Sequence, residues 1–348
     1  EEEAIIISSG DPLWYGIGRT ILEYFPLNKV EFKPSPTCLQ LAFAKIGKEW
    51  QDAKWISLHG RDQENLIKVL KKRPKTLGIL IDPNQGGANE VKTILNALGL
   101  SNAYEFWIFE RLGHCNEAFF KVLPEEEIRE LDPLHLVLLL TKKENIPNAS
   151  TLPIFGLDDG TFYQYEDRPG LMTKKEVRVQ VLAALELPEH GILWDIGSGV
   201  GSIGLEAIRL RPNIKLVAID KRTGCKKLIR KNAKLLGVNP ELIIESDALT
   251  IFEKDLIPSD FSKPDRIILG GGGLKRLDLL KHSLKSLSNK GIIIIPLVTI
   301  EAIQEITSYL KKIKCSFSIT QLQVWRGVPL SKGTRLSPMN PITIIKIK

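Results

Sequence analysis

The chain alternates short runs of β-branched and other apolar residues with stretches in which apolar residues recur every three or four positions. This alternation is typical of α/β proteins. In the first half it predicts strands over 4–8, 55–58, 77–81, 105–109 and 136–140, with helices such as 38–46 and 90–98 between them. The polar segment 141–157 contains two prolines and breaks the alternation, so we expect it to link two domains, 1–145 and 146–348.

The second half continues the alternation with greater regularity. It predicts helices over 174–187, 203–210 and 224–236, and strands over 192–196, 215–219, 241–245, 266–269 and 291–295. This order gives an open, mostly parallel, Rossmann-like sheet with helices on both faces. Two last apolar segments, 317–325 and 343–348, flank a turn-rich piece, and they predict a terminal antiparallel hairpin.

Composition narrows the class of protein. Of the 348 residues, 43% are hydrophobic and 26% charged, which excludes a disordered, collagen-like or disulfide-stapled chain. The four cysteines lie far apart without a CxxC pair, which favours neither a metal site nor disulfides and indicates a reducing cytoplasm. No apolar run approaches the ~18 residues of a membrane helix. The chain opens with three glutamates and no methionine, so we expect its true N-terminus to be missing.

Charge is divided unevenly along the chain. Residues 1–150 hold 18 basic and 21 acidic side chains, a net of −3, whereas residues 151–348 hold 30 and 20, a net of +10. The second half therefore suits an anionic partner, for which nucleic acid, an acidic membrane surface and a polycarboxylate small molecule all qualify on charge. The cationic helix 221–234 is most simply a solvated face; an RNA-binding stripe stays open, without interleaved aromatic residues to support it.

A glycine-rich turn carries the clearest chemical signal. The strand 192–196 runs directly into Gly197, Ser198, Gly199, Val200 and Gly201, which open a helix. Glycines allow a sharp turn and let a ligand approach backbone amides. Asp220 ends the next strand, where its carboxylate can accept the hydroxyls of a ribose. The combination predicts a nucleoside-type cofactor.

Two carboxylates favour S-adenosylmethionine over NAD. Asp195, inside the strand before the turn, would repel a pyrophosphate but suits the ammonium group of a methionine moiety. Asp247 and Ala248 follow the third strand, where a carboxylate can accept from an adenine amino group. Asp247 equally suits the N-cap of the next helix. NAD remains the alternative cofactor.

Candidate substrate contacts lie nearby. The fourth strand ends in Gly270, Gly271, Gly272 and Gly273, which would leave room for a broad, flat substrate or form only a flexible loop. Thr173 and Glu176 form a capping box that predicts a helix start, and spacing cannot separate this role from a Thr173 hydroxyl over the cofactor. Basic residues that could bind substrate carboxylates, or be ordinary surface charge, are Lys174, Lys175, Arg178 and Lys275.

Three turns in the first half belong to motifs that resemble a known family. They are Gly10-Asp11-Pro12, Ser35-Pro36-Thr37 and Leu58-His59-Gly60. With SGDPLWYGIGRT, PSPTCLQLAFAKIG and DPLHLVLLL, the first half resembles a tetrapyrrole methylase. The second half contributes GLMTKKEVR, LWDIGSGVGSIGLEA, AIDKR, ESDAL, RIILGGGG and VWRGVPLSKGTRLSPMNP. Together they resemble the decarboxylating precorrin-6Y C(5,15)-methyltransferases over nearly the whole chain.

The resemblance implies an S-adenosylmethionine-dependent C-methyltransferase of cobalamin biosynthesis, which methylates two ring carbons and decarboxylates an acetate side chain to give precorrin-8. It places cofactor contacts on Thr173, Gly197–Gly201, Asp220 and Ala248, and on the Gly10–Pro12 and Ser35–Thr37 turns of the first domain. Domains of this kind begin with a strand and a GxGPG-like loop that this sequence does not contain. We therefore expect an incomplete first domain, and a chain that acts at carbon 15 but is impaired at carbon 5.

Alternatives remain at this point. The chain could be an RNA methyltransferase, or a second-domain enzyme whose first domain only docks. For the leading interpretation we expect a polycarboxylate tetrapyrrole substrate, a homo-oligomer, and neither nucleic acid nor membrane as a partner. Five scattered histidines offer no nucleophilic triad, and methyl transfer to an electron-rich ring needs mainly alignment of the reacting atoms, so catalytic residues are left unassigned.

Overall fold

The computed structural model describes residues 4–8, 10–58, 63–82, 86–142, 149–168, 170–271, 273–330 and 333–348. It divides into two compact units, which are described separately. The first comprises Glu1–Asn96, Ser101–Lys143 and Pro329–Gly333, and the second comprises Ala97–Leu100, Glu144–Val328 and Thr334–Lys348. Among the described residues, no helix is both long and apolar enough to cross a membrane.

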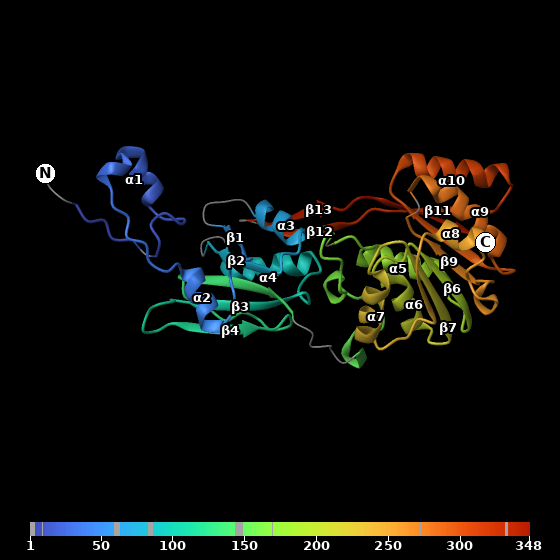
Figure 1. Cartoon of the computed structure of the whole chain (residues 1–348), viewed down its shortest axis with the longest axis horizontal. Helices are drawn as coiled ribbons and strands as arrows, with labels where there is room; N and C mark the ends of the chain where they lie inside the picture. Colours follow the sequence, from blue (N-terminus) through green and yellow to red (C-terminus); the bar gives the residue numbers. More distant parts are fainter. Residues whose placement is uncertain are drawn as a thin grey trace. The chain divides into compact units, whose positions relative to one another are not determined.

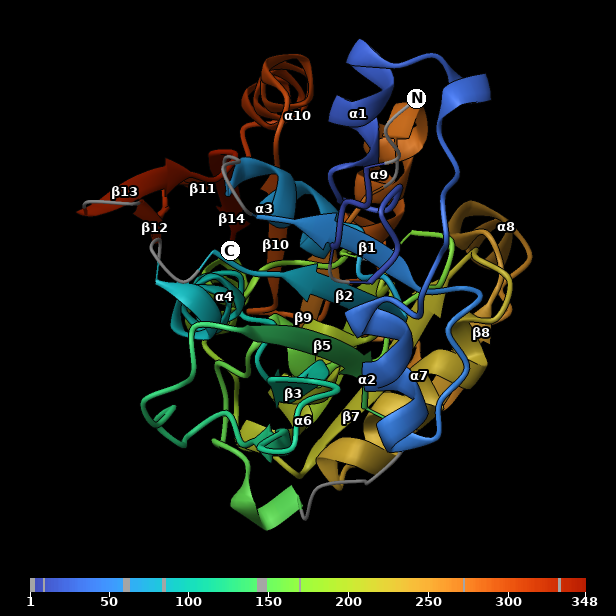
Figure 2. The same cartoon turned by 90° about the vertical axis from the view of Figure 1, so that its left-hand side faces the viewer.

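The first unit contains a five-stranded sheet in the order β1-β2-β5-β3-β4 (Figure 2). Only β1 and β2 are parallel; the other neighbours run antiparallel. Its elements are α1 (Gly18–Tyr24), η1 (Leu27–Lys29), α2 (Cys38–Ile46), β1 (Lys54–Ser57), α3 (Glu64–Lys71), β2 (Thr76–Leu80), α4 (Gly87–Ala97), β3 (Tyr104–Glu110), β4 (Ala118–Val122) and β5 (His135–Thr141). Four predicted strands and both predicted helices are therefore confirmed.

Two elements differ from the sequence prediction. Residues 4–8 form no strand, and Ile5 and Ile7 are 91% and 92% exposed, because no described strand pairs with their backbone. Conversely, β4 was not predicted. Its burial alternates between half-buried and exposed residues, so it lacks the continuous apolar run that marks its neighbours.

The core of the first unit forms where α2 packs on the sheet. Leu39 and Phe43 of α2 belong to one buried cluster with Phe109 and Leu138 of the strands. Gly78 in β2 permits this approach, since a Cβ there would lie 2.6 Å from the Leu39 side chain.

The second unit contains a seven-stranded sheet in the order β11-β14-β10-β9-β6-β7-β8 (Figure 1). Its strands are β6 (Gly191–Ile196), β7 (Ile214–Asp220), β8 (Leu242–Glu245), β9 (Arg266–Leu269), β10 (Ile292–Leu297), β11 (Phe317–Leu322) and β14 (Ile342–Ile347). The five from β10 to β8 are parallel. Strand β14 pairs antiparallel with β10, and β11 pairs antiparallel with β14. The predicted terminal antiparallel pairing is confirmed. The turn-rich piece between its strands forms a further ladder, β12 (Trp325–Leu330) with β13 (Gly333–Pro338), which was not predicted.

Helices cover both faces of this sheet. They are α5 (Lys175–Ala184), α6 (Ser202–Leu210), α7 (Cys225–Leu236), α8 (Ala248–Glu253), α9 (Arg276–Ser286) and α10 (Ile300–Lys312), with short 3-10 turns η3 (Ala149–Thr151), η4 (Asp159–Thr161), η5 (Ser259–Phe261) and η6 (Gly273–Lys275). Alternate strand residues enter opposite cores: Leu193 packs with α5, α6 and α7, whereas Trp194 packs with α8, α9 and α10. The predicted Rossmann-like architecture is confirmed.

The strand order reverses between β6 and β9. From β6 the chain proceeds outward through β7 to β8, and it then returns to β9 on the opposite side of β6. In sheets of this kind ligands bind outside the carboxyl ends of the strands at such a reversal. The glycine turn after β6 and the glycines after β9 both lie at this point.

Candidate functional site

The turn after β6 is fixed by backbone bonds to the neighbouring strand. The amides of Gly197 and Ser198 both donate to the carbonyl oxygen of Ile219 in β7, at 2.8 and 3.1 Å. Gly197 has a φ of 76°, and a Cβ there would lie 2.0 Å from the carbonyl oxygen of Gly270. Only glycine fits, and its absent side chain lets the ends of β6 and β9 touch.

Asp220 lies against this turn, as its position at the end of β7 predicts. Its Oδ2 accepts from the Gly199 amide at 2.7 Å, and its Oδ1 accepts from the Arg222 amide at 2.9 Å. The residue is 9% exposed. The predicted acid and the predicted glycine turn therefore form one constellation.

The turn offers room and unsatisfied polarity for a ligand. Gly199 has a φ of 57°, and a Cβ there would meet no atom within 4 Å. The Ser198 hydroxyl oxygen is buried and has no hydrogen-bond partner in the structure, whereas Val200 is 2% exposed and packs into the core. A buried polar group without a partner is unfavourable, and a bound ligand can satisfy it. The residues present thus fit a nucleoside cofactor.

Asp195 contacts the helix that follows the glycine turn. It is 3% exposed, and its Oδ2 accepts from the amide of Gly204 in the first turn of α6 at 3.1 Å. Burial, with a smaller contribution from Asp220, raises the pKa of Asp195 to about 7. Its observed bond is therefore to the N-terminus of the helix that follows the turn.

The predicted capping box at Thr173 is wrong. Helix α5 begins one residue later than the box requires, with Lys174 at the N-cap and no side-chain cap. Asp159 satisfies the Lys175 amide at 3.0 Å, and Glu176 instead forms a bidentate pair with Arg326 at 2.9 and 2.7 Å. A distant carboxylate has replaced the local cap. The Thr173 carbonyl accepts from Arg178.

Arg178 cannot bind a substrate carboxylate in this structure. It is fully buried, and its guanidinium pairs with Glu206 at 2.9 Å and with Asp159 at 2.8 Å. Its prediction as a surface cation is therefore wrong. Of the other candidates, Lys174 donates to the Gly170 carbonyl at 2.9 Å, Lys175 pairs with Asp158, and Lys275 is exposed.

Two further predicted segments end neighbouring strands. Asp247, after β8, caps α8 by accepting from the amides of Leu249 and Thr250, and Ala248 is the first residue of that helix. After β9, Gly271 and Gly273 have φ values of 76° and 51°, and a Cβ at either would meet no atom within 4 Å. Gly272 lies outside the described residues. The N-cap alternative for Asp247 is thus confirmed. The glycine segment is open at Gly271 and Gly273, but a Cβ on Gly270 would lie 3.3 Å from the Ile196 carbonyl oxygen.

The predicted turns of the first unit meet one another. A Cβ on Gly10 would lie 3.7 Å from both the Pro36 carbonyl oxygen and the Thr37 Cα. The polar side chains there serve local backbone: Asp11 accepts from the Leu13 amide at 2.8 Å, and Thr37 forms a capping box with Gln40. Pro12 accepts from the Gly18 amide, and Ser35 is exposed. His59 and Gly60 lie outside the described residues.

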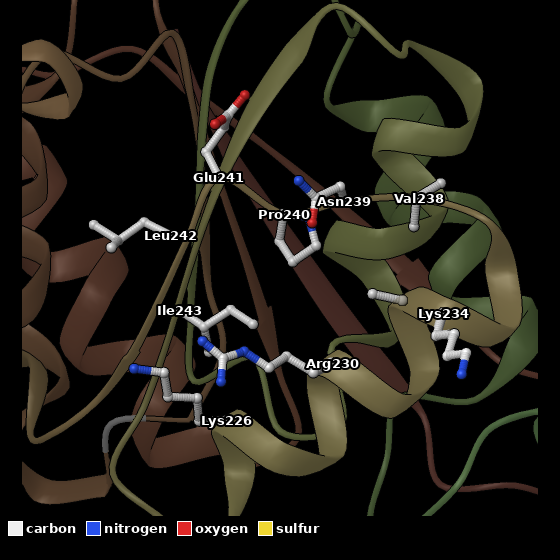
Figure 3. A pocket seen from close by; sticks show the side chains of 10 residues that line it. Lys226, Arg230, Lys234, Val238, Asn239, Pro240, Glu241, Leu242 and Ile243 are labelled. Atoms are coloured by element: carbon white, nitrogen blue, oxygen red, sulfur yellow. The ribbon is translucent and has the colours of Figure 1, made fainter.

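A separate groove flanks the edge strand β8. It has a volume of about 420 Å³ and runs between α7 and β8 (Figure 3). Its lining combines the cations Lys226, Arg230 and Lys234 with polar and apolar residues, which are Ala233, Val238, Asn239, Pro240, Glu241, Leu242 and Ile243. None of the predicted site residues lines it. No cluster of three or more potential metal ligands occurs in the part of the chain that the structure describes.

Comparison with protein families identifies the chain. Residues 164–348 match the precorrin methyltransferase domain, and residues 1–128 match the tetrapyrrole (corrin/porphyrin) methylases. This protein belongs to the precorrin methyltransferase family.

Relatives of this precorrin methyltransferase match either the whole chain or about half of it. The precorrin-6Y C(5,15)-methyltransferase [decarboxylating] of a Sinorhizobium species is 25% identical over 97% of this chain and 78% of its own length. A probable cobalt-precorrin-6B C(15)-methyltransferase (decarboxylating) of Pyrobaculum aerophilum is 34% identical over 55% of this chain and 94% of its own. A solved precorrin-6Y C5,15-methyltransferase from Geobacter metallireducens is 26% identical over 57% of this chain and 98% of its own, with a TM-score of 0.49.

The precorrin methyltransferase also uses residues that the sequence analysis did not single out. Asp159, Glu206 and Arg326 bind the segments around α5, and Asn232 and Tyr165 reach the glycine turn. Only Asn232 had a local signal. It is a polar residue on the otherwise apolar face of α7, three residues after Ile229 and four before Leu236.

Proposed function

We propose that this precorrin methyltransferase transfers methyl groups from S-adenosylmethionine to carbons 5 and 15 of precorrin-6Y and decarboxylates an acetate side chain, giving precorrin-8. The observation that carries the proposal is the pairing of Asp220 with the Gly199 amide at the strand reversal. The relative from Sinorhizobium, which bears both chemistries in its name, matches 97% of the chain and so spans both units.

The cofactor would bind across the turn Gly197–Gly201. Asp220 has lone pairs remaining for ribose hydroxyls, and Asp247, Ala248 and Thr173 would border the rest of the molecule. When bound, S-adenosylmethionine supplies an electrophilic methyl group on a sulfonium. The chain's own residues bind and align it and exclude water.

The substrate would lie over the open glycines after β9. Gly271 and Gly273 leave space beside the turn, and the net charge of +10 in residues 151–348 suits a polycarboxylate. Lys174 and Lys275 are the basic candidates for its carboxylates. Arg178 is excluded because it is buried.

We assign carbon 15 and the decarboxylation to the second unit, and carbon 5 to the first. In support, the relative from Pyrobaculum, which matches only 55% of this chain, is named for carbon 15 and decarboxylation alone. The first unit would bind its own cofactor at the Gly10–Pro12 and Ser35–Thr37 turns and methylate carbon 5.

Asp220→Asn tests the cofactor site. Titration calorimetry with S-adenosylmethionine should show binding weakened by about 10- to 100-fold, on the order of a lost charge-assisted hydrogen bond. Asp260→Asn, the same change at an exposed residue, is the matched control and should bind like wild type. Unchanged affinity in Asp220→Asn would remove this residue from the site.

A mass-spectrometric assay with precorrin-6Y then tests the reaction. We expect the wild type to add one methyl group at carbon 15 with loss of carbon dioxide, and a second methyl group at carbon 5. Transfer of labelled methyl to RNA but not to precorrin-6Y would reject the proposal.

A further inference from the structure

Asn232 in α7 is a fully buried amide with every donor used. Its Nδ2 donates to the Val200 carbonyl at 2.9 Å and to the Tyr163 carbonyl at 3.1 Å, and its Oδ1 accepts from the Tyr163 amide at 2.8 Å. The partners fix the orientation of the amide, since rotating it by half a turn would place its oxygen against two carbonyl oxygens.

These bonds join the glycine turn to a segment far away in the sequence. We call residues 156–165 the strap. Its first end is held where the Gly156 amide donates to Glu206 at 2.6 Å. Its other end reaches the turn at Tyr165, whose hydroxyl lies 3.4 Å from the Gly199 carbonyl oxygen under the Arg222 guanidinium. Asn232 therefore connects the strap, at Tyr163, to the turn, at Val200.

The two carbonyls that are bound from this side belong to adjacent residues of the turn. Gly199 and Val200 lie between two further glycines, and Gly199 and Gly201 have positive φ values of 57° and 80°. Glycine peptides rotate at little cost, so the sequence of the turn alone does not fix where its amides point. A buried hydrogen bond to the Val200 carbonyl does fix the plane of the next peptide.

We propose that Asn232 is a positioning residue for the cofactor. By holding the Val200 carbonyl on the strap side, it fixes the peptide between Val200 and Gly201, whose amide donates to the Ser198 carbonyl at 2.8 Å. This keeps the turn closed on itself and Gly199 within reach of Asp220. The inference rests on the proposed function, because it takes the turn as the S-adenosylmethionine site. Tyr165 also holds the turn, through its hydrogen bond to the Gly199 carbonyl, but more weakly because this bond is long.

Asn232→Asp tests the inference with almost no change in volume. A carboxyl group keeps the acceptor for Tyr163 but, even when protonated, supplies at most one donor for the two carbonyl oxygens. The dissociation constant for S-adenosylmethionine should rise at least tenfold, and the KM for S-adenosylmethionine should rise with little change in the KM for precorrin-6Y. Asn239→Asp makes the same change at an exposed residue beyond α7 and should bind like wild type.

Hydrogen exchange separates positioning from folding. In Asn232→Asp we expect faster exchange confined to peptides of the turn and the strap. Affinity within twofold of wild type would overturn the inference, as would accelerated exchange throughout the second unit. If Asn232→Asp does not fold, Tyr165→Phe takes its place. A two- to fivefold weaker affinity for S-adenosylmethionine then supports the role of the strap, and an unchanged affinity contradicts it.

The wild type separates this inference from the proposed function. If the wild type fails to bind S-adenosylmethionine while exchange in the turn is still faster in Asn232→Asp, the proposed function is rejected, but the link between the strap and the turn through Asn232 is not.

Discussion

Two glycine turns, one in each unit, are predicted to contact a cofactor, but their surroundings differ. Gly197 and Gly10 both have positive φ, at 76° and 67°. At Gly197 a Cβ would lie 2.0 Å from a backbone oxygen of the next parallel strand, whereas at Gly10 the nearest atoms lie 3.7 Å away. The difference shows that the neighbouring strands decide whether a position in a glycine motif requires glycine.

Their polar side chains differ in the same way. Around Gly197, the carboxylate of Asp220 reaches back 21 residues to the Gly199 amide. Around Gly10, the side chain of Asp11 reaches only two residues along the chain. The second unit therefore builds its site from long-range bonds, and the first unit, in the residues described, uses its motif residues to shape local turns.

Removing the buried cation of the second unit should have the largest effect. Arg178→Met removes the guanidinium that pairs with the buried carboxylates of Asp159 and Glu206, so the free energy of unfolding should fall by about 3–5 kcal/mol. Urea denaturation followed by circular dichroism measures it. Arg111→Met in the first unit breaks the exposed pair with Asp132 and should change little. Equal losses in the two variants would contradict the comparison.

The buried ion pairs of Arg178 also show which features could not be predicted from the sequence. The glycine turn, Asp220 and the order of strands could be predicted, because each depends on local periodicity and on strand ends that meet at one sheet edge. The partner of Arg178 could not. Asp159 lies 19 residues away in an irregular segment, and nothing in the spacing marks it as buried.

A partner far away in the sequence also explains why the predicted capping box at Thr173 is wrong. Thr173 and Glu176 have the correct spacing, but Glu176 finds Arg326 150 residues later in the sequence. Such pairs become visible only when β12 is placed beside α5. The buried position of Arg178 did have a signal, since it precedes Val181, Leu182 and Leu185 at helical spacing on the apolar face of α5.

Alanine at the two glycines compares the turns directly. Gly197→Ala must displace the end of β6 or β9, so we expect a loss of roughly 3 kcal/mol in stability and no measurable S-adenosylmethionine binding by the second unit. Gly10→Ala meets no close atom, so only the positive φ costs free energy, about 1 kcal/mol. Thermal unfolding and calorimetry provide both numbers. The comparison fails if Gly10→Ala proves the more damaging variant.

Asp195→Asn should change stability only over a limited range of pH. Burial raises the pKa of Asp195 to about 7 in the folded chain, from its ordinary value of 3.8. Between these values the folded state retains a proton that the unfolded state has lost, so the free energy of unfolding falls as pH rises from about 4 to about 7. An asparagine cannot ionise and still accepts from the Gly204 amide. The variant should therefore lose this slope and be more stable than wild type at pH 8, by on the order of 2–4 kcal/mol at most.

Glu90→Gln supplies the matching experiment in the first unit, because burial and the neighbouring Asp82 also raise the pKa of Glu90 to about 7. Both variants should flatten the fall in stability measured by urea denaturation at a series of pH values. They should differ in ligand binding. Asp195 supports the helix that follows the glycine turn, so its replacement should alter S-adenosylmethionine affinity two- to threefold, whereas Glu90→Gln should leave binding to the second unit unchanged. A pH slope in Asp195→Asn as steep as that of wild type would show that the Asp195 carboxyl does not contribute to it.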